Sequence, residues 1–595
     1  MPNLRIFRNA WIVPAVVALL TLLFLHSPAV PHLSDQPTSF DGERALTDAQ
    51  TLAQQFPGRT PGSDADARSA IWLVERLKQL GLQPRIGTFT AVVDGRSVAL
   101  QNVWAASPGK TGGAIVVLAN RDSPPLDSQG ADDNASGVAS VLELARVFTL
   151  TSHAHQLLFL FTDGDAYGDL GARSFVARHP DLFTIAAVAL RRVGGARMTT
   201  ASLDGWSASP RVAPPWTWIL TSSSQRTVGG LSAPLPHALV QVLHLAAPVG
   251  AGSQGPFVEA GVPAISVGGA GRRPPPQLDV VATISAETLA RVGRGSQALL
   301  TSIDASTSPL SRSGATVFFS RYRTLSGRLV ALTLLALALP LAAVTIDLFA
   351  QARRRKASLG PAWTHFAIRF APWLVLLLVA YSANVVGLLP GGHATAISPE
   401  SLAAQHPQLL RVAALLVVVV IAYRYALVAD RRYLRRAVVA REDVVLVAHL
   451  VLLAAGLVTF LVNPFSLLLF LPAAVLWPLA KPDGWPRSLL PICLGFSAFA
   501  AVLVLSAAQL HLGLSSWWYF FLLLENGTVP VPVAVATMAL LAAALMLARA
   551  LRARPAAAAL PAEEPPPPDE PVDRLEEGVA AITVTVQPPN GSGQG

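Results

Sequence analysis

Hydrophobic and polar positions follow two different patterns along the chain. Between residues 32 and 322, short apolar runs alternate with helical patterns and turn residues. The helical spacing of apolar residues predicts helices at 42–55 and 64–80. Continuous apolar runs predict buried strands at 114–119, 156–161, 185–190 and 263–268. Buried strands separated by helices predict an α/β fold, with a mixed, mostly parallel sheet and helices on both faces.

From residue 327 onward, the apolar runs are long enough to cross a bilayer, which takes about 20 residues. We expect an all-α polytopic transmembrane bundle with seven spans, at 327–350, 366–390, 409–429, 443–463, 465–480, 489–511 and 529–549. Near the N-terminus, an apolar run at 11–25 follows two arginines, so a signal anchor or transmembrane helix is expected there, with a cleaved signal peptide as the alternative. The predicted parts are therefore the anchor (1–31), the α/β domain (32–322), the bundle (327–550) and a disordered, acidic, Pro-rich tail (555–595).

Composition and charge favour a membrane location. Hydrophobic residues make up 52% of the chain, charged residues 14%, and the net charge is +9. The basic residues flank the apolar runs, so the membrane accounts for them and no nucleic-acid partner is predicted. They occupy alternate loops, at 353–356, 431–441, 481–487 and 549–554, whereas 391–408, 463–464 and 512–528 contain no Lys or Arg.

The positive-inside rule then predicts an integral membrane protein with a defined orientation. The basic loops and the C-terminal tail are expected in the cytoplasm, and the α/β domain is expected to be extracytoplasmic. The chain is rich in Arg and Ala and contains few lysines, which indicates a GC-rich genome. A bacterial plasma membrane is the expected location.

Six segments of the α/β region have an order and spacing typical of one enzyme family. They are VVLANRDS (116–123), GADDNASGVASVLELAR (130–146), LFLFTDGDAYGDLGARSF (158–175), VALRRVGG (188–195), GPFVEAGVPAIS (255–266) and ISAETLARVGR (284–294). Together they resemble metallopeptidase family M28 over about residues 42–302. The resemblance implies a Zn-exopeptidase fold whose site holds two zinc ions at the C-terminal ends of strands. With its spans, the architecture is similar to that of the M28-like subunit of GPI transamidase and to membrane-bound M28 peptidases.

The resemblance also assigns the family's functional positions to residues of this chain. The zinc-ligand positions are occupied here by Asn120, Asp133, Ala166, Arg191 and Gln254. Asp165 stands at the position of the general base, where the family has a longer Glu. Only Asp133 keeps a zinc-binding side chain, because amides are poor zinc ligands and Ala offers none. We therefore predict a vestigial site with no intact metal-ligand set and no catalytic residue. No cofactor is expected, and zinc is the cofactor if the family activity is retained.

Further polar residues are candidates for binding. Asp122, Asp132 and Asp163 form an acidic cleft with the two acids named above, which could bind a hard cation such as calcium. The favoured interpretation is that these acids cap helices or pair with nearby arginines. In the bundle, His449 is an ionisable residue inside an apolar span and is the membrane candidate for a functional group.

Three functions remain open from the sequence. The favoured one is a catalytically inactive membrane protein that uses the M28-like domain for binding or assembly. Its partners are then the lipid bilayer and a peptide, a lipid-linked ligand or other membrane subunits. The alternatives are an active zinc aminopeptidase with a rebuilt site, and a transporter. Bound zinc would favour the first alternative, and paired polar residues across the bundle would favour the second.

Overall fold

The computed structural model of the chain describes most of its residues. Described are residues 2–93, 96–123, 128–250, 252–270, 276–307, 309–320, 323–386, 388, 407–434, 439–510, 512–525, 527–552 and 584–587. The chain divides into two compact units, Met1–Arg552 and Ala553–Gly595. The predicted tail at 555–595 lies outside the described residues except for 584–587, as does most of the loop predicted at 391–408. These two predictions stay predictions.

A seven-stranded sheet forms the centre of the α/β domain, with the strand order β1-β2-β4-β3-β5-β7-β6. Its strands are β1 (Arg85–Val93), β2 (Arg96–Ser107), β3 (Ala114–Asn120), β4 (Gln156–Thr162), β5 (Thr184–Arg191), β6 (Ala201–Asp204) and β7 (Ala264–Gly269). The four central strands β4, β3, β5 and β7 are parallel, and β1, β2 and β6 join antiparallel. The mixed, mostly parallel sheet predicted from the sequence is thereby confirmed.

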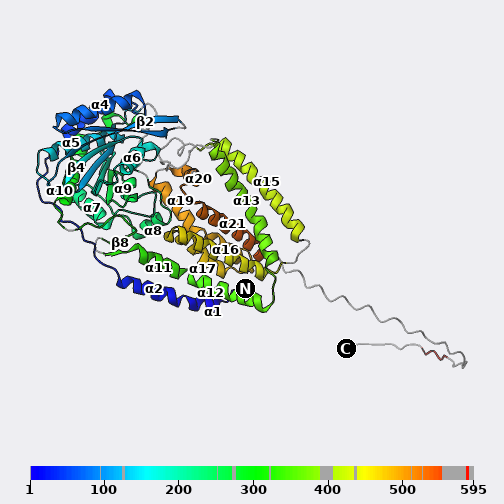
Figure 1. Ribbon diagram of the computed structural model, residues 1–595. Helices are drawn as coiled ribbons and strands as arrows, with labels where there is room; N and C mark the ends of the chain where they lie inside the picture. Colours follow the sequence, from blue (N-terminus) through cyan, green and yellow to red (C-terminus); the bar gives the residue numbers. More distant parts are fainter. Residues whose placement is uncertain are drawn as a thin grey trace, which may run out of the picture. The chain divides into compact units, whose positions relative to one another are not determined.

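Helices cover both faces of this sheet (Figure 1). Side chains of β3 alternate between two cores, with Val116 and Leu118 in one and Ile115 and Val117 in the other. The second core is shared with α3 (Gly42–Gln55), α4 (Asp64–Gln79), α5 (Gly137–Thr149), α7 (Pro215–Thr227) and α10 (Ala286–Asp304). The first is shared with α6 (Leu170–Arg178), α8 (Ala238–Ala246) and α9 (Gly255–Glu259), and it continues into the C-terminal helices.

Among the described residues, six helices or helix pairs are long and apolar enough to cross a membrane. They are α1–α2 (Leu4–Leu23), α11–α12 (Gly327–Arg354), α13 (Gly360–Val385), α15 (Leu409–Leu434), α16 (Arg441–Val462) and α21 (Val531–Arg552). A bent pair, α18 (Trp485–Leu494) and α19 (Ser497–Gln509), makes a seventh if it is one span. Large apolar side chains such as Ile12, Ile346 and Leu378 are exposed on these helices, as expected of surfaces that face lipid.

The structure differs from the expected count of spans at residues 465–480. There the chain forms a shorter apolar helix, Pro464–Leu479, which comprises α17 (Leu467–Leu476) and short flanking turns. At a rise of about 1.5 Å per residue, this segment is shorter than the ~30 Å hydrocarbon core of a bilayer. Prolines shorten its regular part, because Pro464 precedes it and Pro472 lies inside it.

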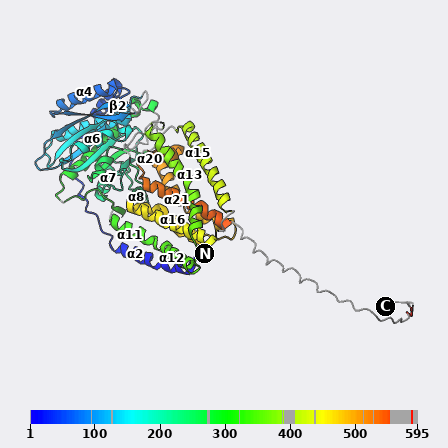
Figure 2. The same ribbon diagram turned by 45° about the vertical axis from the view of Figure 1, so that its right-hand side comes forward.

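The N-terminal helix packs beside the first helix after the α/β domain. Thr21 of α2 shares a hydrogen bond of 3.1 Å with Thr333 of α11, and the backbone of His26 pairs with that of Thr324. Figures 1 and 2 show α2 and α11 side by side. The two segments that flank the α/β domain in sequence therefore meet beside it.

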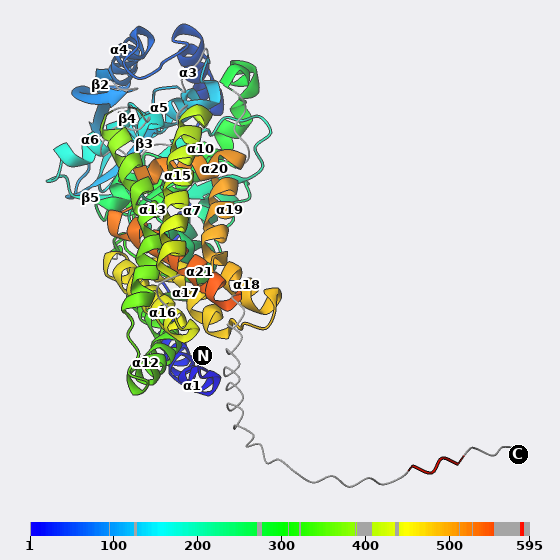
Figure 3. The same cartoon turned by 90° about the vertical axis from the view of Figure 1, so that its right-hand side faces the viewer.

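The helix ends that carry the basic segments gather at one end of the bundle. Arg355, which follows α12, pairs with Glu442 and Asp443 at the start of α16. Arg441 donates a hydrogen bond of 3.0 Å to the carbonyl of Ala550 in α21. Figure 3 shows α1 and α12 at this end, away from the sheet. The ends of α1, α12, α16 and α21 at this side of the bundle all carry basic residues, on which the positive-inside rule depends.

The opposite end of the bundle contacts the α/β domain. Asn463 and Ser466, between α16 and α17, donate hydrogen bonds of 2.7 and 2.6 Å to the carbonyls of Leu245 and Ala246 in α8. Phe465 and Leu467 beside them lie in the core that continues into the domain. Domain and bundle thus form one packed body within Met1–Arg552.

Candidate functional site

The acidic turn after β3 is held in place by residues from distant parts of the chain. The backbone N–H groups of Asp132 and Asp133 donate hydrogen bonds of 2.6 and 3.0 Å to the carboxylate of Asp279. The side-chain amide of Asn134 donates to Oδ1 of Asn120 and to the carbonyl of Leu190, at 2.9 and 3.0 Å. The turn is therefore fixed between the C-terminal ends of β3 and β5, where sites on open α/β sheets form.

An arginine lies between the two acids of the predicted site. Arg191 is the last residue of β5, and its Nη2 lies 3.0 Å from Oδ2 of Asp165. Its Nε lies 3.9 Å from Oδ1 of Asp133. Ser253 adds a hydrogen bond of 2.8 Å from its Oγ to Asp165. A fixed positive charge thus links the bridging-ligand position and the general-base position.

The other three predicted ligand positions offer no metal-binding group. The amide of Asn120 is engaged by Asn134 and donates to the carbonyl and carboxylate of Asp122, at 3.2 and 3.3 Å. Gln254 is buried, with its Nε2 3.5 Å from the carbonyl of Trp206. The side chain of Ala166 is a buried methyl group.

These residues do not fit the two zinc ions of the family. Among the residues that the structure describes, no group of three or more His, Cys, Asp or Glu side chains is placed to hold a metal ion. The guanidinium of Arg191 lies against both remaining carboxylates, and its charge opposes a dication there. The chemistry of the donor set therefore disagrees with a two-zinc centre.

Comparisons with known proteins bear on the same region. Residues 102–300 match the family model described as Peptidase family M28. These residues form an M28 domain.

Curated relatives match about a quarter of this chain. The alkaline phosphatase isozyme conversion protein of Escherichia coli is 32% identical over 162 residues, which are 24% of this chain and 47% of that protein. The probable lipoprotein aminopeptidase LpqL of Mycobacterium tuberculosis is 29% identical over 139 residues, or 23% and 28% of the two chains. The chain thus spans less than half the length of these curated relatives.

Solved structures with a similar fold include two kinds of enzyme. An aminopeptidase from Aneurinibacillus sp. strain AM-1 is 15% identical, with 44% of this chain and 93% of that chain covered and a TM-score of 0.38. A glutaminyl cyclase from an Acidobacteriales bacterium is 18% identical, with 47% and 99% covered and a TM-score of 0.39.

The cleft acids of the M28 domain are engaged by donors from the protein itself. Asp163 pairs with Arg121 at 2.8 Å, and Arg121 also pairs with Asp66; all three side chains are buried. Asp132 accepts hydrogen bonds from Gly194 N–H and Ser136 Oγ, at 2.8 and 3.2 Å. Asp163 therefore has an arginine partner, and Asp132 has hydrogen-bond donors from within the domain. We call Asp66, Arg121, Asp122, Asp133, Asp163, Asp165 and Arg191 the strand-end cluster.

Burial also changes the acidity of Asp122 in this cluster. The carboxylate of Asp122 accepts a hydrogen bond of 3.0 Å from the backbone N–H of Asp165. Burial raises the pKa of Asp122 well above its ordinary value, and the nearby carboxylates of Asp165 and Asp163 raise it further. Folding therefore makes the carboxyl group of Asp122 harder to ionise than a solvent-exposed one.

Sequence reasoning missed three residues that support this site. Arg59 is fully buried and donates to five backbone carbonyls, including those of Arg121 and Gly130 on either side of the acidic turn. Asp279 and Ser253 reach the site from loops more than 80 residues away from the residues they contact. No local sequence pattern distinguishes Asp279 and Ser253. Arg59 lies in the segment PGRTPGS (57–63), whose Pro, Gly and Ser residues indicate an ordered turn.

The membrane candidate His449 is enclosed in the bundle. It is fully buried on α16, and its Nδ1 lies 2.7 Å from the carbonyl of Val445 one turn earlier.

A cluster of charged side chains between three helices of the bundle was not predicted from the sequence. Asp430 of α15 pairs with Arg369 of α13 and Arg549 of α21 at 2.7 and 2.5 Å, and Nε2 of His365 lies 2.8 Å away. We call His365, Arg369, Asp430 and Arg549 the span cluster.

Proposed function

We propose that the M28 domain of this protein is a non-catalytic module for binding or assembly, displayed on the outer face of a membrane. The observation that carries the proposal is the position of Arg191, whose guanidinium lies against Asp133 and Asp165. In the family, these two positions serve the metal-bound water and the base that activates it. Here a permanent cation neutralises both carboxylates, so neither is free to bind a metal or to take a proton.

The remaining positions support the same conclusion. Rebuilding an M28 zinc site would require new ligands at Asn120, Ala166 and Gln254 as well as the removal of Arg191. A carboxylate at Asp165 is one methylene shorter than the family's Glu, and positioned bases tolerate errors of only about 0.5 Å. The strand-end residues keep their places in the fold and are held by ion pairs within the domain, which suits binding or assembly rather than hydrolysis.

Turnover by the full chain tests this proposal. The protein is purified in detergent, incubated with added zinc, and assayed with aminoacyl p-nitroanilide substrates beside the variant Asp133→Asn. We expect no zinc-dependent turnover from either protein. Zinc-dependent turnover that is present in the wild type and lost in Asp133→Asn would contradict the proposal, because a contaminating peptidase would be unaffected by the substitution.

Charge and helix packing support the proposed outer location. The chain has several helices able to span a membrane, and the helix ends with basic residues meet at the end of the bundle that lies away from α8. If those ends are cytoplasmic, the M28 domain is extracytoplasmic, and in a bacterium it lies outside the plasma membrane. Lipid is then the constant partner of the chain, and a peptide, a lipid-linked ligand or another subunit is the partner of the cleft.

Labelling of intact bacteria that express the protein tests the orientation. Replacing Cys493 by Ser removes the only cysteine, and new cysteines are placed at exposed Ser152 in the domain and at exposed Ser358 after α12. A membrane-impermeant maleimide should label Ser152→Cys in intact cells and Ser358→Cys only after the cells are opened. The reverse pattern would contradict the orientation.

A further inference from the structure

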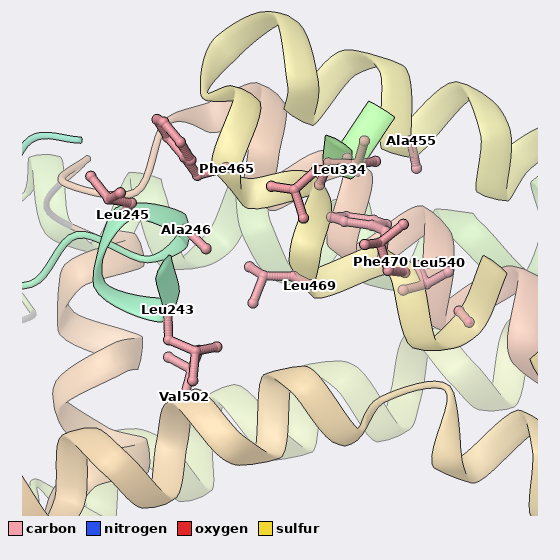
Figure 4. Close-up of a cluster of buried hydrophobic side chains, with 14 of the residues drawn as sticks. Leu243, Leu245, Ala246, Leu334, Ala455, Phe465, Leu469, Phe470, Val502 and Leu540 are labelled. Atoms are coloured by element: carbon pink, nitrogen blue, oxygen red, sulfur yellow. The ribbon is translucent and has the colours of Figure 1, made fainter. Parts of the chain in front are cut away.

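A cavity of about 580 Å³ lies where the M28 domain meets the membrane helices. The domain contributes residues 208–210 and 246–249 to its wall, and the bundle contributes residues from α16, α17, α19, α20 (Ser516–Glu525) and α21. Figure 4 shows this junction, with Leu243 of α8 directed toward Val502 of α19 and with Leu469 of α17 nearby. Its volume is within the range of about 300–1,000 Å³ that is typical of pockets for small molecules.

The wall of the cavity is almost entirely apolar. Its bundle side includes Phe499, Val502 and Leu503 of α19, and Trp517 and Phe520 of α20. Among the described residues of the lining there is no Asp, Glu, Lys, Arg or His. An ionic ligand or a sugar would therefore find no charged partner in the cavity.

Three polar side chains in the wall form hydrogen bonds within the protein. Asn463 donates to the carbonyl of Leu245, and its Oδ1 accepts from the N–H of Phe465 at 3.1 Å. Ser466 donates to the carbonyl of Ala246, and Thr537 donates to that of Val533 at 2.9 Å. Water in such a space would lack the two to four partners that buried waters normally have.

The cavity lies beside the ends of candidate membrane spans. It is enclosed by the last residue of α16, Val462, and by residues near the start of α21, so it sits at the domain-side ends of candidate spans. Trp517, which is 44% exposed, stands in its wall, and tryptophan is enriched at the boundary between hydrocarbon and headgroups. We infer that the cavity binds the hydrocarbon chain of a membrane lipid from the adjoining leaflet.

One segment joins this cavity to the strand-end cluster. Pro248 and Val249 line the cavity, and Ser253, four residues on, donates its hydrogen bond to Asp165. Four residues span at most about 14 Å, so the two sites are neighbours.

Photolabelling of the full chain tests the inference. The protein is reconstituted in vesicles of phosphatidylcholine that contain a phospholipid with a diazirine in its acyl chain, and the labelled residues are mapped by mass spectrometry. The inference predicts labelling concentrated on cavity residues of α19, α20 and α21. In Leu503→Trp and in Val533→Trp, where an indole fills the space, this labelling should be lost.

A neighbouring position provides the matched control. Val504 is 66% exposed and does not line the cavity, so Val504→Trp should keep the wild-type labelling. Each variant is first checked for a monodisperse elution profile in size-exclusion chromatography. Labelling spread evenly over all lipid-facing helices of the wild type, or unchanged in the two filling variants, would overturn the inference. Either result leaves the expectation about zinc-dependent turnover unchanged, so the two proposals fail separately.

Discussion

The strand-end cluster and the span cluster both bury charge, but they balance it in opposite ways. In the strand-end cluster, five acids surround two arginines, and Asp66, Asp122 and Asp163 are buried near one another. In the span cluster, a single acid, Asp430, faces two arginines and a histidine. The arginines are the minority charge in the strand-end cluster, and Asp430 is the minority charge in the span cluster. Removing a minority charge leaves several buried charges of the same sign without a partner.

The largest effect is expected from Arg121→Met in the strand-end cluster. Arg121 is fully buried between Asp66 and Asp163, so its removal leaves two carboxylates facing each other without a cation. Breaking a buried pair costs about 3–5 kcal/mol, and two pairs are broken here. We expect the full chain in detergent to lose at least that much free energy of unfolding, as measured by urea titration with tryptophan fluorescence.

Two further variants sharpen this result. Lys78→Met removes an exposed ion pair with Glu75 and should change the free energy of unfolding by less than about 1 kcal/mol. The triple variant Arg121→Met, Asp66→Asn, Asp163→Asn should recover part of the loss, because it removes the buried charges together. A triple variant as unstable as the single one would show that charge balance is not the cause.

A smaller but still large effect is expected from Asp430→Asn in the span cluster. It leaves buried Arg369 beside His365 without an acid, although Arg549, at 44% exposure, can turn toward water. We expect a loss of about 3 kcal/mol, at the lower end for a broken buried pair. Glu442→Gln, which weakens an ion pair with half-exposed Arg355, should lose less than about 1 kcal/mol. Equal losses of unfolding free energy in the two variants would show that burial of the span cluster does not strengthen its ion pairs.

A moderate effect is expected from Arg191→Gln. Arg191 is 17% exposed and its partner Asp165 keeps the hydrogen bond from Ser253, so the loss should be about 1–3 kcal/mol, as for hydrogen bonds to charged groups. The variant should also gain no zinc-dependent turnover, because Asn120, Ala166 and Gln254 still offer no ligands. Turnover that appears on this single substitution would show that Arg191 alone blocks a competent site.

The smallest effect is expected from Asp122→Asn, and it should depend on pH. The pKa of Asp122 is raised in the folded state by burial, so the stability that this group contributes is present below its unfolded pKa and is lost as the pH rises through its folded pKa. An Asn cannot ionise, so the variant should gain stability relative to the wild type as the pH rises. Thermal unfolding in detergent at several pH values between 4 and 8 measures this. A stability difference that is constant or falls with pH would contradict the assigned shift.

The centre of the fold could be predicted because its strands are buried on both faces. All seven residues of β3 are buried, and such runs stand out in the sequence as continuous apolar segments. The edge strand β1 was not predicted, because exposed residues such as Arg85 and Ile86 interrupt its apolar positions. The short α17 was expected to span the membrane, because hydropathy alone does not show where prolines end a regular helix.

The candidate site was predictable where neighbouring strands place its residues. Motif spacing located Asp133 and Asp165 after β3 and β4, and Arg191 at the end of β5. The parallel order of these strands brings the three residues together. The contact from Asp279 was not predictable, because it depends on how a distant loop packs. In the span cluster, His365 and Arg369 are spaced by four residues on α13, a helical pattern that indicates one shared face.

The zinc content of the purified full chain tests the central claim most directly. The protein is expressed in zinc-supplemented medium, purified in detergent, dialysed against a zinc-free buffer and analysed by plasma mass spectrometry beside Asp133→Asn. If the M28 domain is non-catalytic, both proteins should contain far less than one zinc ion per chain. One or two zinc ions per wild-type chain, lost in Asp133→Asn, would show that the acidic turn still belongs to a metal centre and would contradict the account.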